Sequence, residues 1–345
     1  MKVKKYNIKR MIGQGLFLVC CLTLLSSCFR EEEFDNDPQG NFEQLWTLID
    51  EKYCFLDYKE IDWNAIHTKY RRRITSDMSS EGLFQVLGEM LNELRDGHVN
   101  LASAHNVSYY DDWYQDYPRN YRDDIVKDHY LGRASTDYRT AAGMKYKAFE
   151  NNVGYIRYES FSDPIGNGNL DEVLSYLAVC KGLIIDVRDN GGGNVTNSTN
   201  IASRFTNEKV LTGYIRYKTG KGHNDFSDPF AIYLEPSNNV RWQKRVVVLT
   251  NRACYSAAND FVNQMRYLPN VTVMGDKTGG GAGMPFTSEL PNGWTVRFSA
   301  SPHFNASMEH IEGGIEPDKK VDMTDEDMMK NKDTIIEAAC NFLLN

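Results

Sequence analysis

Apolar residues recur at helical spacing through residues 41–95. Phe42, Leu45 and Ile49 lie three or four positions apart, as on the buried face of a helix. Two further stretches of the same kind follow, one of them opened by Asp62 as a possible N-cap. Short polar breaks separate the three stretches, so this region predicts a small bundle of three helices.

The pattern changes near residue 145, where short apolar runs begin to alternate with amphipathic segments. The runs "KGLIIDVRD", "RVVVLTN" and "NVTVMGD" are continuous, as in strands that are covered on both faces. Each of the first two runs is followed by a segment of helical character. Strand and helix in alternation predict parallel βαβ units and therefore an α/β fold class.

Residues 101–143 are polar, rich in Tyr and Asp, and show no clear period. We interpret them as a long irregular connection with space for one strand. Ordered loops of this length are often functional, so the segment could shape part of a cleft.

The N-terminus has the pattern of an export signal. A basic start is followed by the short apolar run "MIGQGLFLVCCLTLL", and residues 1–27 are interpreted as a signal peptide. The ending "LSSC" resembles the lipobox of bacterial lipoproteins, which implies that Cys28 carries lipid. The alternative is a plain signal peptide with an incidental cysteine. Residues 28–40 are polar and acidic, as expected of a tether.

Composition narrows the class of protein. The chain has 345 residues and a formal net charge of -8, which argues against a nucleic-acid binder because such a protein presents a basic face. No cysteine after the signal lies in a CxxC pair, so we expect no zinc site, no other metal and no cofactor. An exported protein could form disulfides, but Cys180 and Cys254 lie in or beside apolar segments and suit buried positions.

Three polar features carry candidate chemistry. Ser256 follows the strand "RVVVLTN" at the start of a helix, where it is either a nucleophile at the carboxyl edge of the sheet or an N-cap. Gly191–Gly193 follow the strand "GLIID", where they either direct backbone N–H groups at a ligand or form a tight turn. The phosphate-loop pattern GxxxxGK[ST] is absent. His98, beside a glycine, is a candidate base or a surface histidine.

Together, "GLIIDVRDNGGGN", "TNRACYSAAND", "GDKTGGG" and "GGIEPD" resemble, in order and context, the C-terminal processing and tricorn-core serine peptidases. The resemblance covers roughly residues 40–345. It implies a ClpP/crotonase-like core with a spiralling sheet at 144–345 and a three-helix N-terminal subdomain at 41–100. The connection at 101–143 offers no clear PDZ domain.

The resemblance also implies roles for individual residues. Ser256 matches the nucleophile, and the amides of Ala257 and of Gly191 or Gly192 match the oxyanion hole. Processing peptidases use a Ser-Lys dyad, but the position of that lysine falls on Gly281 here. Lys277 matches an earlier lysine that is not catalytic.

The tricorn-like branch uses a histidine instead, and His98 in "RDGHVNL" takes that position as the general base. Its acidic partner matches Glu312, one residue short in spacing, with Glu316 as the alternative. The serine that precedes the histidine in tricorn is Gly97 here. His303 and His310 are rival bases in the late segment.

The expected function is that of a secreted, lipid-anchored serine endopeptidase that cleaves peptides or proteins through an acyl-enzyme on Ser256. The expected location is the bacterial envelope, as an outer-membrane lipoprotein facing the periplasm or the exterior, held to the membrane by its lipid. The alternative is a non-catalytic lipoprotein of the same fold that binds peptides or small ligands. A crotonase-type acyl-CoA enzyme is disfavoured, because export would remove the chain from cytosolic CoA.

Overall fold

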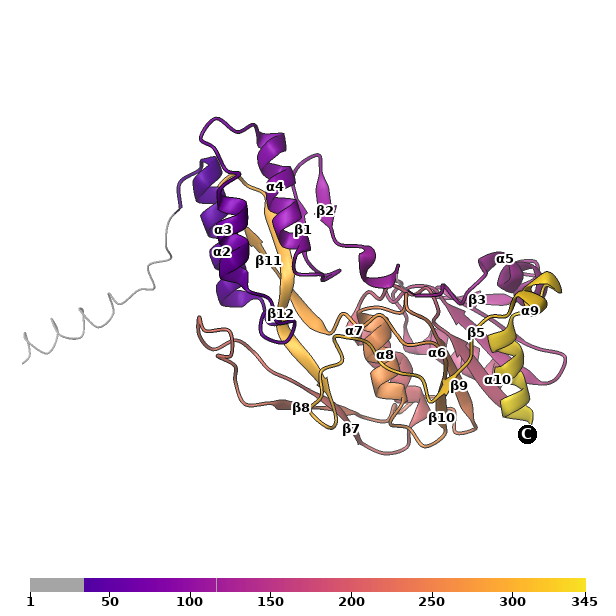
Figure 1. The fold of residues 1–345 in the computed structure, drawn as a ribbon. Coiled ribbons are helices and arrows are strands. Elements are labelled where there is room, and N and C mark those ends of the chain that lie inside the picture. The colour runs from indigo at the N-terminus through magenta and orange to yellow at the C-terminus, as the bar shows by residue number, and fades with distance from the viewer. Residues whose placement is uncertain (1–33, 116) are drawn as a thin grey trace, which may run out of the picture.

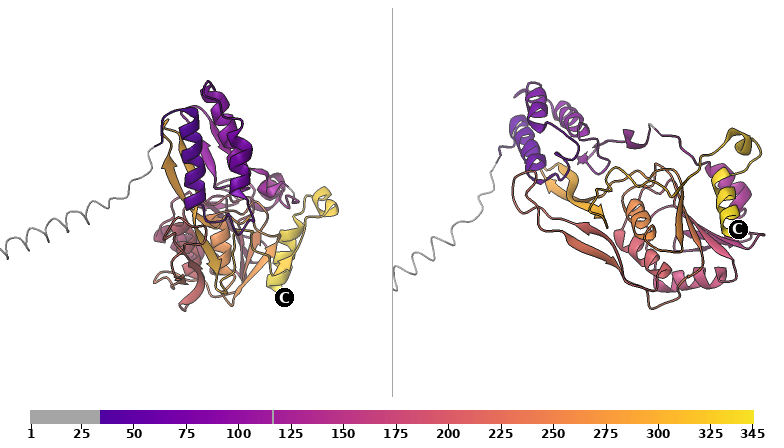
Figure 2. Two further views of the ribbon diagram at one scale, coloured as in Figure 1. Left: turned by 60° about the vertical axis from the view of Figure 1, so that its left-hand side comes forward. Right: turned by 60° about the horizontal axis from the view of Figure 1, so that its bottom comes forward.

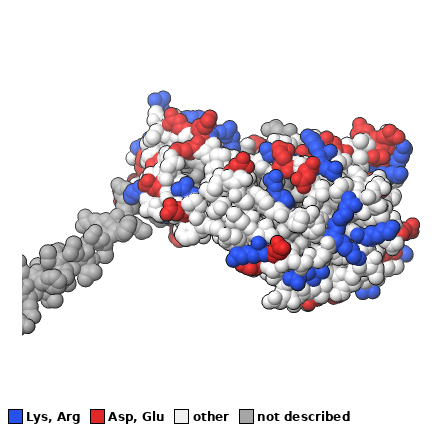
Figure 3. Space-filling model, turned by 90° about the horizontal axis from the view of Figure 1, so that it is seen from below, with Lys and Arg blue, Asp and Glu red and all other residues white. Residues whose placement is uncertain are grey.

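The structure is a computed structural model and describes residues 34–115 and 117–345. It contains two β-sheets, each covered by helices, with the N-terminal helices at one end of the molecule and the C-terminal helix at the other (Figures 1 and 2). On the face shown in Figure 3, acidic and basic side chains are interspersed. Within the described residues, no helix is both long enough and apolar enough to cross a membrane.

The larger sheet has seven strands in the order β13-β10-β9-β6-β5-β4-β3. Its strands β5, β6, β9, β10 and β13 run parallel, whereas β3 and β4 are antiparallel. The bounds are β3 Arg139–Ala141, β4 Met144–Ala148, β5 Val153–Tyr158, β6 Gly182–Asp186, β9 Val246–Thr250, β10 Val271–Gly275 and β13 Lys319–Lys320.

Helices cover both faces of this sheet, which explains the continuous apolar runs of its central strands. Leu183 and Ile185 of β6 share a buried cluster with α6, α7 and α8, whereas Ile184 faces the cluster that contains α10. Every residue of β6 and β9 is buried. The bounds are α6 Asn167–Leu177, α7 Val195–Ala202, α8 Ala257–Met265, α9 Asp325–Met329 and α10 Thr334–Leu344, with a 3-10 turn η3 at Ser203–Phe205.

The second sheet has the order β2-β1-β12-β7-β8, and β11 pairs with β12 outside this path. Its bounds are β1 Asn100–Ala102, β2 Val107–Tyr109, β7 Val210–Ile215, β8 Phe230–Leu234, β11 Gly283–Glu289 and β12 Thr295–Asn305. Helices α2 Pro38–Lys52, α3 Trp63–Arg71 and α4 Ser80–Asn92 pack on it. Asp62 caps α3 by accepting a hydrogen bond from the Ala65 N–H at 2.9 Å, as its position predicts.

The three N-terminal helices share their core with strands from the far end of the chain. Leu290, Val296 and Phe298 lie in the same buried cluster as the helices. The range 41–100 therefore shares its hydrophobic core with the second sheet, because an amphipathic helix must bury its apolar face against another element. The first helix also begins at Pro38, inside the acidic segment that was expected to be a tether.

The connection at 101–143 contains more regular structure than the single strand for which the sequence left space. It holds β2, β3, a 3-10 turn η1 at Asp112–Tyr114, the short α5 at Asp123–Ile125 and the π-helical turn η2 at Val126–Leu131. These elements are three to six residues long, which is too short to leave a clear periodicity in the sequence.

The described cysteines carry no disulfide. All are free and buried, namely Cys54, Cys180, Cys254 and Cys340. Cys254 donates from its Sγ to the Val187 carbonyl at 2.9 Å and thereby joins β9 to the end of β6.

Candidate active site

Ser256 lies at the turn between β9 and α8, in a strained backbone conformation. Its φ of 57° and ψ of -121° are unfavourable for a residue with a side chain, and such strain persists only where surrounding contacts impose it. The Ser256 N–H donates to the Gly280 carbonyl at 2.8 Å, and the Tyr255 N–H donates to the Asn190 carbonyl at 3.1 Å. These bonds bring three of the four family motifs together at the start of α8.

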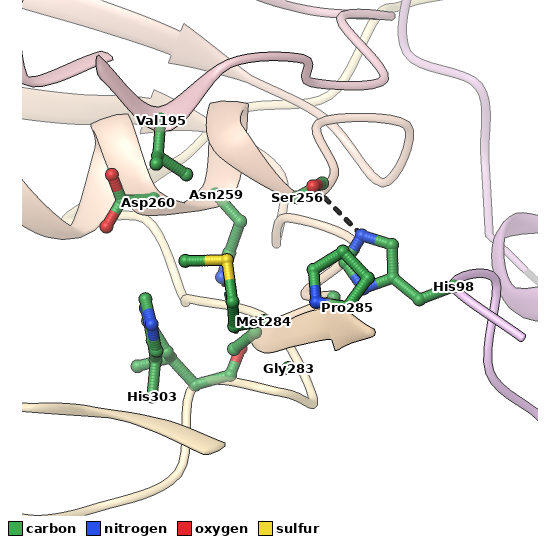
Figure 4. Close-up of a pocket in the computed structure, with 12 residues that line it drawn as sticks. His98, Val195, Ser256, Asn259, Asp260, Gly283, Met284, Pro285 and His303 are labelled. Atoms are coloured by element: carbon green, nitrogen blue, oxygen red, sulfur yellow. Dashed lines mark hydrogen bonds between the residues drawn. The ribbon is translucent and has the colours of Figure 1, made fainter. Parts of the chain in front are cut away.

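His98 contacts the Ser256 hydroxyl directly. Its Nε2 lies 2.9 Å from Ser256 Oγ (Figure 4). The Asp96 carboxylate accepts the His98 backbone N–H at 2.8 Å and so fixes the loop that carries the ring. Burial lowers the pKa of His98 to about 4, against the attraction of Asp96. The imidazole is therefore neutral near pH 7, with Nε2 able to accept the serine proton.

The glycine turn after β6 packs against the serine turn. A Cβ on Gly192 would lie 2.8 Å from both Ala257 N and Ser256 Cβ, and Gly192 has a φ of +99°. Its N–H donates to Asn190 Oδ1 at 2.9 Å. Within the described chain, the amides of Gly191 and Ala257 have no hydrogen-bond acceptor. Of the two glycines that sequence left open, Gly191 is thus the one with an unused donor.

Glu312 lies in a buried charged cluster, and within the described residues it forms no hydrogen bond or ion pair with His98 or Ser256. Its carboxylate accepts the Ala282 N–H at 2.7 Å and pairs with Lys59 Nζ at 3.0 Å. Burial, with repulsion from Asp96, raises the pKa of Glu312 to about 7. The alternative, Glu316, is 70% exposed in its side chain and pairs with Lys277 at 3.3 Å, far less enclosed than Glu312.

Two members of this cluster were missed from the sequence. Lys59 lies between the carboxylates of Glu312 and Asp96, with its Nζ 3.7 Å from Asp96 Oδ2. Asp96 also accepts hydrogen bonds from Tyr53 and Ser299, both at 2.9 Å. Asp96 stands in the "RDGH" motif, which could have drawn attention to it. Lys59 is in a polar loop between α2 and α3 and leaves no local signal.

Gly281 and Gly97 are the two positions where this chain departs from the family pattern, and aromatic side chains fill the space beside both. A Cβ on Gly281 would lie 2.3 Å from Cζ of Tyr255, so a lysine there would displace that ring. A Cβ on Gly97 would lie 2.8 Å from Trp113 Nε1 and 3.1 Å from the Tyr255 hydroxyl. Trp113 and Tyr255 stack with ring centroids 4.1 Å apart. Their stacked rings occupy the space that side chains at 97 and 281 would need.

The rival histidines lie away from the serine. His303 lines the same pocket, but at the end opposite Ser256 and His98 (Figure 4). His310 packs among aromatic rings, with centroids 4.2 Å from Tyr58 and 4.4 Å from Phe304.

Two other expectations concern a metal and a lipid. In the part of the chain that the structure describes, no group of three or more His, Cys, Asp or Glu residues could hold a metal ion. Cys28, the expected site of lipid attachment, lies outside the described residues.

Comparisons with known proteins identify the family and the fold. The model of Peptidase family S41 matches residues 152–321, and that of the Tricorn protease C1 domain matches residues 34–92. A crystal structure of a putative peptidase from Parabacteroides merdae is 52% identical, with a TM-score of 0.85, over 90% of this chain and 98% of that chain.

More distant relatives support the same assignment. The carboxy-terminal processing protease CtpA of Bacillus subtilis is 26% identical over 178 residues, which are 51% of this chain but 36% of that protein. The present chain therefore matches about a third of the length of this curated relative. Mature CPAF in complex with lactacystin is 12% identical, with a TM-score of 0.65 over 89% of this chain and 97% of its own, and shows the shared fold.

The family models, the close likeness over nearly the whole described chain and the Ser256–His98 pair lead to one conclusion. The chain belongs to peptidase family S41 and has the fold of a serine-type peptidase.

Proposed function

We propose that the protein is a serine endopeptidase that hydrolyses peptide bonds through an acyl-enzyme on Ser256. The observation that carries this proposal is the 2.9 Å distance between Ser256 Oγ, at the start of α8, and Nε2 of His98, which is buried and neutral. A nucleophile and a base within hydrogen-bond reach are what acyl transfer requires.

In the first half of the reaction, His98 Nε2 accepts the Ser256 proton as Oγ attacks the substrate carbonyl. The amides of Ala257 and Gly191 supply the oxyanion hole, where two fixed N–H donors stabilise the developing negative charge. His98 then passes its proton to the leaving amine, and the acyl group remains on Ser256. Water, deprotonated by His98 in turn, hydrolyses the acyl-enzyme.

The buried carboxylates give this cycle electrostatic support. Asp96 favours the charged form of His98, so it stabilises the imidazolium that forms during each half-reaction. Glu312 and Lys59 act indirectly, because Lys59 forms ion pairs with both carboxylates and Glu312 accepts a hydrogen bond from the Ala282 amide. In this proposal Glu312 is a positioning residue.

The substrate class is peptide or protein. For location, we propose a lipid anchor at Cys28 in an outer-membrane lipoprotein of a bacterial envelope, facing the periplasm or the exterior. Its support is the order of basic, apolar and "LSSC" segments at the N-terminus. Metabolic labelling with a fatty-acid analogue, compared between the wild type and Cys28→Ser, tests the anchor.

An activity-based fluorophosphonate probe tests the central proposal. We expect the probe to label the wild type and Ser307→Ala, which removes an exposed serine, but not Ser256→Ala. If the wild type is folded and remains unlabelled between pH 6 and 9, the chain is instead a ligand-binding lipoprotein on a peptidase fold.

A further inference from the structure

The turn that carries Ser256 presents a second side chain to His98. Tyr255, the residue before Ser256, has its ring centroid 5.0 Å from that of His98, with the two ring planes at 55°. The Ser256 hydroxyl lies 2.9 Å from His98 Nε2. Two consecutive residues of one turn therefore lie against the imidazole, one at its reacting nitrogen and the other beside its ring.

The Tyr255 hydroxyl also reaches the carboxylate next to His98. It donates to Asp96 Oδ1 at 3.3 Å, and the same oxygen accepts the His98 backbone N–H at 2.8 Å. Burial, with repulsion from Asp96 and Glu312, raises the pKa of Tyr255 well above its ordinary value. The hydroxyl therefore remains a hydrogen-bond donor at every pH at which the protein would act.

Neighbouring groups fix the Tyr255 side chain in this place. Trp113 stacks on its ring, with centroids 4.1 Å apart and planes 28° from parallel. Gly281 leaves space for the ring, because a Cβ there would lie 2.3 Å from the tyrosine Cζ. The backbone N–H of Tyr255 donates to the Asn190 carbonyl at 3.1 Å. The side chain is thus held beside His98 from several directions.

The charged groups that act on His98 come from several segments of the chain. Burial is the main cause of its low pKa of about 4, and Asp96 acts in the opposite direction. Arg297 and His303 on β12, together with Lys59 in the α2–α3 loop, lower the pKa further. The tyrosine adds no charge to this set. Its effect on the imidazole must come from its hydrogen bond to the carboxylate and from the water that its ring displaces.

We propose that Tyr255 is a positioning residue for the general base: its hydroxyl holds the Asp96–His98 segment, and its ring keeps water from the imidazole. The inference rests on the proposed peptidase function and adds to it a residue that takes no part in the proton transfer itself. Because the hydroxyl and the ring act on His98 in different ways, each can be removed separately.

Tyr255→Phe removes the hydroxyl and keeps the ring. In the peptide assay we expect kcat to fall by about 10- to 100-fold, as a small displacement of a catalytic group does. KM should stay within about twofold, because the groups that bind substrate are unchanged. The acid limb of kcat/KM should remain near the His98 pKa of about 4, since the ring still covers the imidazole.

Tyr146→Phe is the matched control. Tyr146 is also buried, and its hydroxyl donates to the Glu172 carboxylate at 2.7 Å. It lies on β4, which two strands separate from β9. This variant should leave kcat unchanged, with urea titrations comparing the stabilities. An unchanged kcat in Tyr255→Phe, or an equal loss of kcat in the two variants, overturns the role of the hydroxyl.

Tyr255→Leu removes the ring, and its readout needs no turnover. NMR titration in the Ser256→Ala background, with the His98 signal assigned through Ser256→Ala/His98→Gln, reports the pKa of the imidazole directly. Entry of water should raise this pKa from about 4 toward 6.5, by more than about one pH unit. Ser256→Ala/Tyr255→Phe should titrate as Ser256→Ala does. An unchanged pKa in the folded leucine variant refutes the shielding by the ring.

The titration also separates this inference from the proposed function. If the wild type resists the fluorophosphonate probe but His98 titrates higher in Ser256→Ala/Tyr255→Leu, the peptidase proposal fails and the shielding by Tyr255 stands. If the probe labels Ser256 and neither tyrosine variant differs from its reference, the peptidase proposal stands and Tyr255 only fills space.

Discussion

At the scale of single residues, the site depends on a histidine held in its uncharged form. Burial makes His98 a weak base in the ground state, and Asp96 compensates once the ring takes a proton. Ser256 meets this ring because its backbone is forced to a φ of 57°. Both side chains are thus positioned before substrate arrives, which is the condition for efficient proton transfer.

Replacement of His98 tests the assignment of the base. His98→Ala should lower kcat by roughly 10⁴-fold or more, because base and nucleophile act as a unit. His105→Ala, which removes an exposed histidine, should leave kcat unchanged in the same peptide assay. Unchanged turnover in His98→Ala would direct attention to His303 or His310.

The pH dependence of kcat/KM offers an independent check. His98 must be unprotonated to accept the serine proton, so activity should fall as the pH drops through its pKa of about 4. We expect no loss from His98 between pH 7 and 6, where an ordinary histidine would already protonate. An acid limb centred near pH 6.5 would show that the ring is less desolvated in solution than its burial implies.

At the scale of elements, the β6–α7 turn and the β9–α8 turn act as one unit. The first turn can approach the second only where no Cβ intervenes, which accounts for Gly192. Gly193 similarly lies against the backbone of Phe161, since an added Cβ would meet Ser162 N at 2.2 Å. These glycines hold the unused amides of Gly191 and Ala257 near the serine.

Gly192→Ala should therefore damage both folding and catalysis. Its Cβ would meet the Tyr255 carbonyl oxygen at 2.6 Å, in a conformation that disfavours side chains. We expect a loss of about 1–3 kcal/mol in the free energy of unfolding and a roughly 100-fold loss of kcat from the misplaced turn. Gly168→Ala has open space around its Cβ and is the control, with unchanged kcat. Urea titrations and peptide kinetics measure the two effects.

At the scale of the whole molecule, the site is assembled across the interface between the two sheets. The loop after α4 brings Asp96 and His98, the larger sheet brings Ser256, and the segment after β12 brings Glu312. Lys59, from the α2–α3 loop, joins the carboxylates of Asp96 and Glu312. Any change that loosens the helical layer should therefore disturb the position of His98.

Lys59→Met tests this linkage. It leaves two buried carboxylates without their cation, so the free energy of unfolding near pH 7 should fall by about 3–5 kcal/mol. Lys69→Met removes an exposed lysine that pairs with Glu93 at the surface, and should lower the free energy of unfolding far less than Lys59→Met does. Equal stabilities of the two variants in urea would show that the buried cluster does not hold the layers together.

The sequence by itself determined the parts that rest on local pattern. Continuous apolar runs identified β6, β9 and β10, because strands covered on both faces leave no polar positions. The three N-terminal helices followed from their spacing, and the family from four motifs in order. Ser256, His98 and the glycine turn were found because each stands within such a motif.

Tertiary structure alone decided which of these groups touch. Glu312 pairs with Lys59 and with the Ala282 amide rather than with His98. Trp113 and Tyr255 fill the space beside Gly97 and Gly281. Tertiary structure also joined Leu290, Val296 and Phe298 to the N-terminal helices, across some 200 residues of chain. The physical reason is the same throughout: burial and charge pairing depend on distances between segments, and local spacing does not encode them.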